Sequence, residues 1–321
     1  MGIDAALAAV LLSARVAGVD FSETATLGKQ TFFPTRKSMD EIARAFVLPG
    51  GAAAVFERCG SSGDKFLELV GAKSVTSFDV SDFEGATVIH DMNEPVPPEF
   101  HGKFTAVIDG GTLEHIFNVR QAFKNALEMV CLGGHYLCVT CGNNLFGHGF
   151  YQISSDFFYQ SLTPENGFSE TAVLLCLPTL EPPRFYAVAP PTLLGRRVEL
   201  VNDRPAYLLA IARRTSLDPV FACHPQQSDY QAAWQRAAGG DAEPPVALPR
   251  GFAERATERF LKLFPRSKRA TVKRTIAGDK ARTDFRQSCY QRLTLHDLAQ
   301  GKMTDPAIES VSSPARQARL R

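Results

Sequence analysis

The sequence lacks the features that mark secreted and membrane proteins. Its seven cysteines, an odd number spread from Cys59 to Cys289, have neither the density nor the pairing of a disulfide scaffold. The longest apolar run near the start, residues 3–19, is interrupted by Ser13 and Arg15 and has no basic leader or small-residue cleavage site. We therefore expect no disulfides, no secretion signal and no transmembrane segment, and we expect the protein in the reducing cytoplasm.

The sequence also has little net charge, but its charge is unevenly distributed. The formal net charge is +1, yet residues 250–321 hold 17 Lys and Arg against 7 Asp and Glu. This basic segment can dock on an anionic surface, or it can be a helix with one solvated face, which is the simpler interpretation. It contains few interleaved aromatic residues and no recognisable nucleic-acid module, so a nucleic-acid partner is not expected.

What the sequence does contain is an alternation of strand-like and helix-like segments. With 321 residues and 45% hydrophobic content, the chain can bury a large core. Short apolar segments predict strands at residues 74–79, 87–90, 104–109, 135–140, 171–177 and 207–212. Helical patterns occupy residues 3–17, 64–70 and 119–130, and a capping-box pattern at 38–41 opens another helix. This order predicts an α/β fold: a Rossmann-like, doubly wound, mostly parallel seven-stranded sheet with helical additions at both ends.

The chain divides into three parts by composition. Residues 1–45 predict an N-terminal helical cap, and residues 46–216 predict the Rossmann-like domain. Proline and glycine become frequent between Asp218 and Gly251, which indicates a linker. Residues 217–321 are interpreted as this linker and a basic, largely helical extension, with helices at 252–264 and 281–293. Association into a homo-oligomer stays open.

Acidic residues end two of the expected strands. Asp79 closes the strand at 74–79, where a carboxylate can accept hydrogen bonds from both hydroxyls of a ribose. Asp91 follows the next strand, where it can accept from an adenine amino group while Met92 packs on the ring. A strand-terminal Asp is also a common turn or cap residue, so the order and spacing of the two acids carry the interpretation.

Residues 72–168 resemble the class I S-adenosylmethionine-dependent methyltransferases, and specifically a bacterial subgroup associated with small-molecule or glycan modification. The resemblance rests on five segments: 77–81 (SFDVS), 91–93 (DMN), 106–117 (AVIDGGTLEHIF), 129–134 (MVCLGG) and 147–152 (GHGFYQ). It covers about a third of the chain closely. Its members are specific as an ordered set, and none is specific alone.

The resemblance implies that S-adenosylmethionine binds across the strand ends. The loop at 109–113 would approach the methionyl part of this cofactor, and its glycines let the backbone come close to a ligand. The cofactor-binding residues expected on this basis are Gly60, Asp79, Val80, Ser81, Asp91, Met92, Asn93, Asp109, Gly110, Gly111, Thr112 and Leu113.

The opening motif of the family is degenerate in this chain. The family begins with a strand, an acid and a glycine-rich turn of the form DxGxGxG. The corresponding stretch is expected at residues 52–63 (AAAVFERCGSSG), where Glu57 replaces the acid and Gly60 and Gly63 supply a shorter turn. The helix at 64–70 would then direct its amino end at the ligand. Lys29 and Gln30 either reach the cofactor carboxylate from outside the core or belong to an ordinary surface loop.

Two histidines are the candidate general bases. Histidine as a residue type can accept a proton close to neutrality, so His115 or His148 can take the proton of an acceptor hydroxyl or ammonium. The alternatives are that His115 only fixes its loop and that Gly147 and Gly149 only form a tight turn. The residues expected to bind the acceptor are Glu114, Asn143, Asn144, Tyr151 and Gln152.

No metal site is expected from the spacing of the ligating residues. Cys138 and Cys141 have CxxC spacing, but on a strand they point to opposite faces, and no second pair completes a zinc site. Glu114, His115 and Asp109 form a less favoured cation site, because these residues lie in one loop without a convincing further ligand.

The sequence predicts an S-adenosylmethionine-dependent O- or N-methyltransferase that acts on a small-molecule or saccharide-like acceptor. The alternative is a non-catalytic, methyltransferase-like binding or scaffold protein that docks through its basic C-terminal region. The degenerate glycine turn favours the alternative, whereas Asp79, Asp91 and Asp109 at successive strand ends favour the enzyme.

Overall fold

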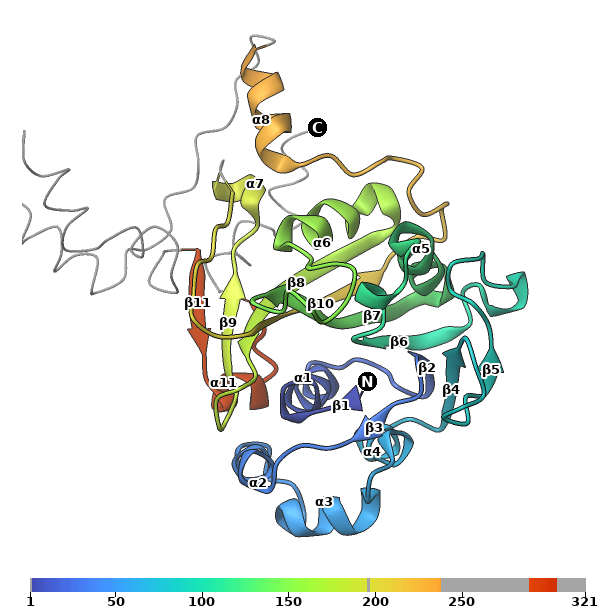
Figure 1. Ribbon diagram of the computed structural model, residues 1–321, viewed down its shortest axis with the longest axis vertical. Coiled ribbons are helices and arrows are strands. Elements are labelled where there is room, and N and C mark those ends of the chain that lie inside the picture. Colours follow the sequence, from blue (N-terminus) through green and yellow to red (C-terminus); the bar gives the residue numbers. More distant parts are fainter. Residues whose placement is uncertain (1, 195–196, 238–288, 305–321) are drawn as a thin grey trace, which may run out of the picture.

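The computed structural model describes residues 2–194, 197–237 and 289–304. These residues form a nine-stranded sheet in the order β11-β9-β8-β10-β7-β6-β2-β4-β5 (Figure 1). The strands are β2 (Glu23–Leu27), β4 (Ser74–Asp79), β5 (Val88–Ile89), β6 (Phe104–Gly110), β7 (Val130–Asn143), β8 (Phe168–Leu177), β9 (Arg184–Val188), β10 (Ala206–Arg214) and β11 (Tyr290–Leu293). From β5 to β7 neighbours run parallel, and from β7 to β11 they run antiparallel. The expected mostly parallel, seven-stranded sheet is therefore wrong in its strand number and in its second half.

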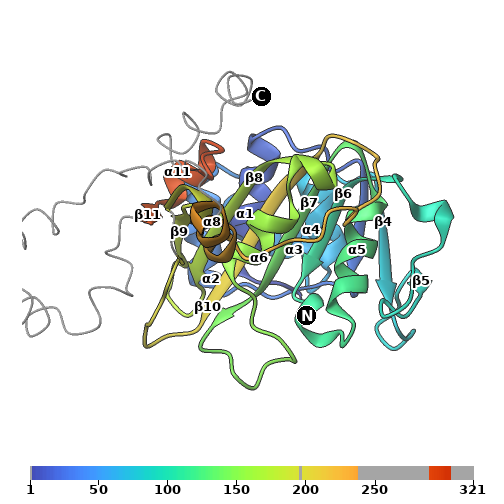
Figure 2. The same cartoon turned by 90° about the horizontal axis from the view of Figure 1, so that it is seen from above.

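Helices cover both faces of this sheet (Figures 1 and 2). One side holds α1 (Ala5–Val16), α2 (Arg36–Ala45), α3 (Gly51–Cys59), α4 (Gly63–Val70) and α11 (Leu295–Ala299). The other side holds α5 (Val119–Met129), α6 (Ser155–Ser161) and α7 (Pro191–Leu194), and α8 (Ser228–Ala237) packs on α7. A separate parallel pair, β1 (Gly2–Ile3) and β3 (Thr31–Phe32), lies beside the central strands.

The helix α1 lies inside the molecule. Its N-cap Asp4 accepts a hydrogen bond from Leu7 N at 2.9 Å, which satisfies one of the free amides of the first turn. All its residues from Ala5 to Ala14 are buried, and they pack against one face of the sheet. Ile108 of β6 contacts this layer, whereas Val107 contacts the opposite layer, as expected of a strand that is buried on both faces.

The central strand β2 comes from a segment that the sequence assigns to the N-terminal cap. It lies between β4 and β6, so the sheet begins before the expected domain boundary at residue 46. Its two buried threonines satisfy their hydroxyls locally: Thr24 Oγ1 donates to Phe21 O at 2.6 Å and Thr26 Oγ1 donates to Gly28 O at 2.9 Å. The strand expected at residues 52–63 is wrong, because this alanine-rich stretch forms α3 and the turn before α4.

Other local expectations have mixed outcomes. The helix at 64–70 and the late strand pair β8 and β10 are confirmed. The N-cap of α2 is Thr35, whose hydroxyl accepts from Ser38 N at 3.2 Å, and not Ser38. Tyr290–Leu293 forms an edge strand where a helix is expected, while the helix expected at 252–264 lies outside the described residues. Within the described ranges, every helix is too short or too polar to cross a membrane.

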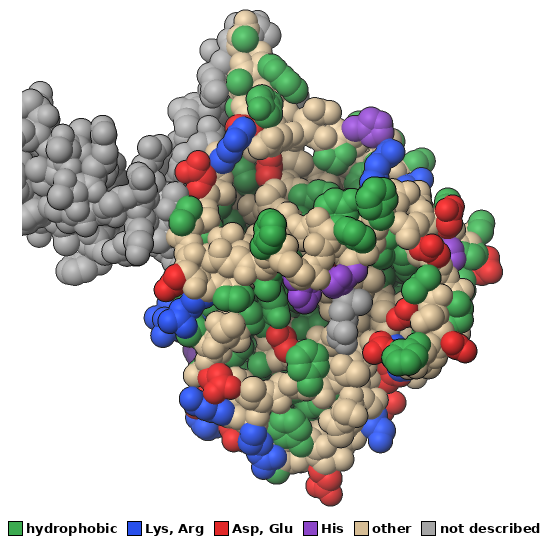
Figure 3. Space-filling model, viewed as in Figure 1, with side chains coloured by type: hydrophobic (Ala, Val, Ile, Leu, Met, Phe, Trp, Pro, Cys, Tyr) green, Lys and Arg blue, Asp and Glu red, His purple; other side chains and the backbone are tan. Residues whose placement is uncertain are grey.

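The side chains on the face seen in Figure 1 are not evenly distributed. Some histidine side chains lie near the middle of this face and others toward its margin, hydrophobic side chains are spread across it, and most Lys, Arg, Asp and Glu side chains lie toward its rim (Figure 3).

Candidate functional site

The five parallel strands place their carboxyl ends at one edge of the sheet. Along the chain, β2 is followed outward by β4 and β5, and the chain then returns to the other side of β2 with β6 and β7. Leu27 of β2 pairs with Phe78 of β4 and with Asp109 of β6, so these strands end in one row. Ligands of open α/β sheets bind outside the carboxyl ends where the strand order reverses, which here is between β2 and β6. The candidate site is therefore built from the turns that follow these strands.

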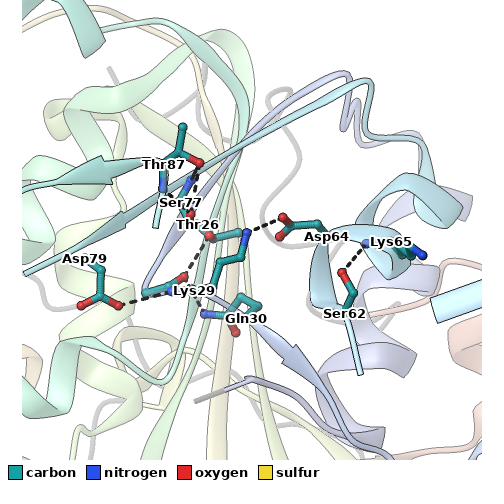
Figure 4. A network of polar contacts seen from close by, with 10 residues as sticks. Thr26, Lys29, Gln30, Ser62, Asp64, Lys65, Ser77, Asp79 and Thr87 are labelled. Carbon is teal, nitrogen blue, oxygen red and sulfur yellow. Dashed lines mark hydrogen bonds and ion pairs between the residues drawn. The ribbon is translucent and has the colours of Figure 1, made fainter. Parts of the chain in front are cut away.

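The turn after β2 connects three elements at this edge. Gly28 has a φ of 71°, and its amide donates to Phe78 O at 2.7 Å. Lys29 N donates to Asp79 Oδ2 at 3.4 Å, and Lys29 Nζ forms an ion pair with Asp64 Oδ2 at 2.5 Å in the first turn of α4 (Figure 4). Lys29 thus lies at the end of the central strand, so this segment, which the sequence places outside the core, is part of the switch point.

Gln30 fills the space between this turn and β6. Its side chain is buried, and Nε2 donates to Leu27 O at 2.9 Å and to Gly28 O at 3.2 Å. Its Oε1 has no hydrogen-bond partner among the described residues. A Cβ on Gly110 would lie 2.3 Å from this oxygen, and a Cβ on Gly63 would lie 2.4 Å from Gln30 O. Glycine at both positions lets the loops close around Gln30, and the unpaired acceptor suits a donor from a ligand or an ordered water.

The acids after β4 and β5 differ in how they are held. Asp79 is partly exposed at the end of β4 beside the Lys29 amide, and Val80 and Ser81 continue this turn as exposed residues. Asp91 Oδ1 accepts from Asn93 N at 2.9 Å and from Asn93 Nδ2 at 2.7 Å, and these bonds lower the pKa of Asp91. Both carboxylates therefore reach the surface at the strand ends, and the lowered pKa keeps Asp91 ionised at neutral pH.

The loop that carries Asp91 is anchored by residues of α5 that the sequence does not single out. Asn125 is fully buried, and its Nδ2 donates to Met92 O at 3.2 Å and to Glu94 O at 2.7 Å. Asn118 is the N-cap of α5, and its backbone N–H donates to Asn93 Oδ1 at 2.9 Å. Asn93 and the buried Met92 thus attach the loop to α5. The sequence feature that could have identified Asn125 is a polar residue at an apolar position of an amphipathic helix.

The loop after β6 turns its acid inward. Asp109 is fully buried; its Oδ1 accepts from Thr112 N at 2.7 Å and its Oδ2 from Cys138 Sγ at 3.5 Å. Burial, and then the charge of Glu114, raises the pKa of Asp109 to about 7. Thr112 Oγ1 donates to Leu27 O at 2.8 Å, which ties the loop to the turn after β2. Asp79, Asp91 and Asp109 thus lie at the same edge of the sheet. The side chains of Asp109 and Leu113 are buried below this edge, and Gly110 and Gly111 contribute only backbone groups to the loop.

The structure brings the two candidate bases together beside a buried carboxylate. The ring centroids of His115 and His148 are 5.0 Å apart, and both side chains are exposed. Glu114 is 2% exposed, and its Oε1 lies 4.0 Å from His148 Nε2. Glu114 Oε2 accepts from Thr140 Oγ1 at 2.8 Å, and Glu114 Oε1 accepts from Cys141 Sγ at 3.5 Å. The hydroxyl of Thr140 and the thiol of Cys141, the second cysteine of the CxxC pair, thus position Glu114.

Backbone contacts join the two loops that carry these histidines. Phe150 N donates to Glu114 O at 2.7 Å, and Tyr151 Oη donates to Phe117 O at 2.6 Å. A Cβ on Gly149 would lie 2.6 Å from Glu114 O, so a glycine is needed for this close approach. Tyr151, which the sequence predicts to bind the methyl acceptor, therefore uses its hydroxyl group to fix the loop.

The other predicted residues lie at the margins of this site. Asn143 Nδ2 donates to Asn202 Oδ1 at 2.8 Å and Asn144 Nδ2 donates to Asn202 O at 2.7 Å, while Gln152 Oε1 accepts from Leu145 N at 3.0 Å. These side chains support the loop between β7 and α6. Gly60 ends α3 with a φ of 54°, whereas Gly63 is the glycine that meets Gln30.

Two cavities of the described residues lie away from the strand ends. One of about 440 Å³ is lined by residues 180–184 and 292–296, between the end of β8 and the β11–α11 segment. The other, of about 400 Å³, lies between α2 and the start of α3. We therefore define the candidate site by the switch point and its polar groups.

Comparison with known proteins gives structural neighbours alone. No family model and no curated protein matches the chain. The chain is similar to a possible histamine N-methyltransferase from Thermotoga maritima, at 12% identity and a TM-score of 0.33, over 64% of this chain and 89% of that one. It is similar to the N-methyltransferase NodS from Bradyrhizobium japonicum, solved with S-adenosyl-L-homocysteine, at 13% identity and a TM-score of 0.36, over 65% and 86%.

Proposed function

We propose that this protein is a methyltransferase that uses S-adenosylmethionine to methylate an oxygen or nitrogen of a small-molecule acceptor. The proposal rests above all on the β2–β6 switch point, which places the Gly28–Lys29 turn and Asp79 at the same edge as the Glu114–His115 loop. S-adenosylmethionine would supply an electrophilic methyl group on a sulfonium. The chain would bind and orient both molecules and would take up the acceptor proton.

The groups along this edge match the parts of the cofactor. Asp79 would accept from the two ribose hydroxyls, and Asp91 would accept from the adenine amino group. Lys29, which pairs with Asp64, would attract the cofactor carboxylate. The unpaired buried oxygen of Gln30 adds an acceptor at the switch point. Asp109 does not fit a direct contact, because its carboxylate is buried against Thr112 and Cys138.

The acceptor would bind over the two histidines. His115 or His148 would take the proton from an acceptor hydroxyl or ammonium as the new bond to carbon forms. Glu114 lies 4.0 Å from His148 and would stabilise the imidazolium that results. The neighbouring loops expose Phe117, Phe146 and Phe150, which suits an acceptor with a planar, apolar or sugar ring.

Calorimetric titration with S-adenosyl-L-homocysteine and S-adenosylmethionine tests the proposal. Wild-type protein should bind both, and Asp79→Asn should weaken binding by about 1.5–3 kcal/mol through loss of charge-assisted hydrogen bonds. Asp82→Asn, an exposed carboxylate in the following turn, is the matched control and should bind normally. Absence of binding at millimolar ligand would contradict the proposal and would favour the scaffold alternative.

A further inference from the structure

The cluster behind the proposed acceptor site has the composition of a metal centre. Glu114, His115 and His148 each offer one ligand atom, and these atoms lie within 4.8 Å of one another. Two imidazoles with one carboxylate bind divalent transition metals such as iron, zinc or cobalt and leave coordination positions open. The sequence spacing does not predict this site, because His148 is far from Glu114 and His115 along the chain. It comes from the loop that follows β7, whereas Glu114 and His115 lie in the loop that follows β6.

The charge around Glu114 favours a cation. Its carboxylate is 2% exposed, and among the described residues no lysine or arginine forms an ion pair with it. Its hydrogen-bond donors, Thr140 Oγ1 and Cys141 Sγ, are neutral groups. A carboxylate buried in this way without a cation is costly, and a divalent ion would supply the missing charge.

The loops already hold the three ligands near the required geometry. Two atoms bonded to one ion at about 2.1 Å lie about 3–3.4 Å apart. Glu114 Oε1 and His148 Nε2 are 4.0 Å apart, so a modest rotation of exposed imidazoles brings the set to that spacing. Glu114 itself is fixed by Thr140, and its carbonyl accepts from Phe150 N. A carboxylate oriented by a neighbouring hydroxyl is typical of the supporting contacts around metal ligands.

We propose that Glu114, His115 and His148 bind one divalent transition-metal ion of the zinc and cobalt class. Imidazole ligands favour these ions over magnesium and calcium, which prefer oxygen. Because both histidines are exposed, the open coordination positions face solvent at the proposed acceptor site. Metal binding itself does not depend on the proposed methyltransferase function. In the metal-bound protein both imidazoles are ligands and take up no proton, so under the proposed function the ion would replace the histidine base: it would bind an acceptor oxygen and favour the loss of its proton.

Titration of metal-free protein with Zn²⁺ and Co²⁺ tests the site. The full chain, prepared without a histidine tag and treated with a chelator, should bind one ion per molecule, and Co²⁺ should develop ligand-field absorption. His115→Ala and His148→Ala should each weaken Zn²⁺ binding by at least about tenfold, as loss of a ligand exceeds loss of a supporting contact. Mg²⁺ should not compete at equal concentration.

His224→Ala is the matched control, because His224 is an exposed histidine beside the exposed Cys223 and is the obvious competing site. It should leave Zn²⁺ binding unchanged. Absence of stoichiometric Zn²⁺ binding, or binding that survives both cluster variants and is lost with His224→Ala, would overturn the proposal. Binding of S-adenosyl-L-homocysteine to the same metal-free protein is measured in parallel. Cofactor binding without metal binding defeats the metal site alone, and metal binding without cofactor binding defeats the methyltransferase alone.

Discussion

The carboxamide of Gln30 occupies the space that a side chain on residue 110 would need. A Cβ on Gly110 would lie 2.3 Å from Gln30 Oε1 and 3.2 Å from Gln30 Nε2. Because Nε2 also donates to Leu27 O and Gly28 O, the carboxamide has little freedom to move aside. One side chain thus joins the turn after β2 to the end of β6, which are the two sides of the switch point.

Gly110→Ala should therefore destabilise the protein. Overpacking at a filled, buried position typically costs about 1–3 kcal/mol, and the displaced Gln30 would also lose its bonds to the turn after β2. Urea unfolding measures this loss. Gly147→Ala is the matched control, because nothing lies within 4 Å of the Cβ it would add. Equal stability of the two variants would show that Gln30 moves freely.

Lys29→Met separates ligand binding from stability. The Lys29–Asp64 ion pair is partly exposed, so its loss should change the free energy of unfolding by no more than about 1 kcal/mol. The affinity for S-adenosyl-L-homocysteine should fall more, because Lys29 would lose its attraction for the cofactor carboxylate, and the loss should shrink at high salt. Lys65→Met, on the exposed side of α4, should change neither quantity. Calorimetry at two salt concentrations decides.

Asp109 should make stability fall as the pH rises. Below about pH 4 its carboxyl group is protonated in the folded and unfolded chains and contributes nothing. Between about pH 4 and its folded pKa of about 7, the unfolded chain loses the proton while the folded chain keeps it, so unfolding is favoured as pH rises. Above pH 7 the full penalty is present, with an upper limit on the order of 4 kcal/mol for this rise in pKa.

Asp109→Asn removes this titration while keeping an acceptor for Thr112 N. The stability of the variant relative to wild type should therefore increase from pH 4.5 to pH 8, by up to a few kcal/mol. Urea unfolding of both proteins across this range gives the difference, in which titrating groups distant from Asp109 cancel. A difference that is flat with pH would show that Asp109 titrates normally.

Much of the fold could be predicted from local patterns, but the central strand could not. The strand at residues 104–109 and the helix at 64–70 show clear hydrophobic periodicity and hold up in the structure. β2 has a short, threonine-containing sequence whose burial depends on hydroxyl groups bonded to its own backbone. The sequence of such a strand is polar enough to hide its burial between β4 and β6, and the sequence pattern therefore places the glycine turn in the alanine-rich segment that forms α3.

Individual residues of the candidate site could be predicted from the sequence, but their arrangement in space could not. Asp79 is the last residue of β4 and His115 lies in the turn after β6, and each position is a local signal. That His148 lies beside His115, and that Asp109 turns inward, depends on how separate loops pack. Spacing along the chain cannot report such contacts, which is why the third ligand of the proposed metal site was missed.

Asn125→Ala should release the loop that carries Asp91. Asn125 donates to Met92 O and Glu94 O, and its Oδ1 accepts from Val96 N at 3.0 Å. Its removal leaves these backbone groups without partners inside the protein, so we expect a loss of about 2–4 kcal/mol. Gln121→Ala removes a single bond to Asn125 and should cost about 1 kcal/mol or less. If the methyltransferase proposal holds, cofactor affinity should fall in Asn125→Ala alone, and a normal affinity would show that Asp91 makes no contact with the adenine.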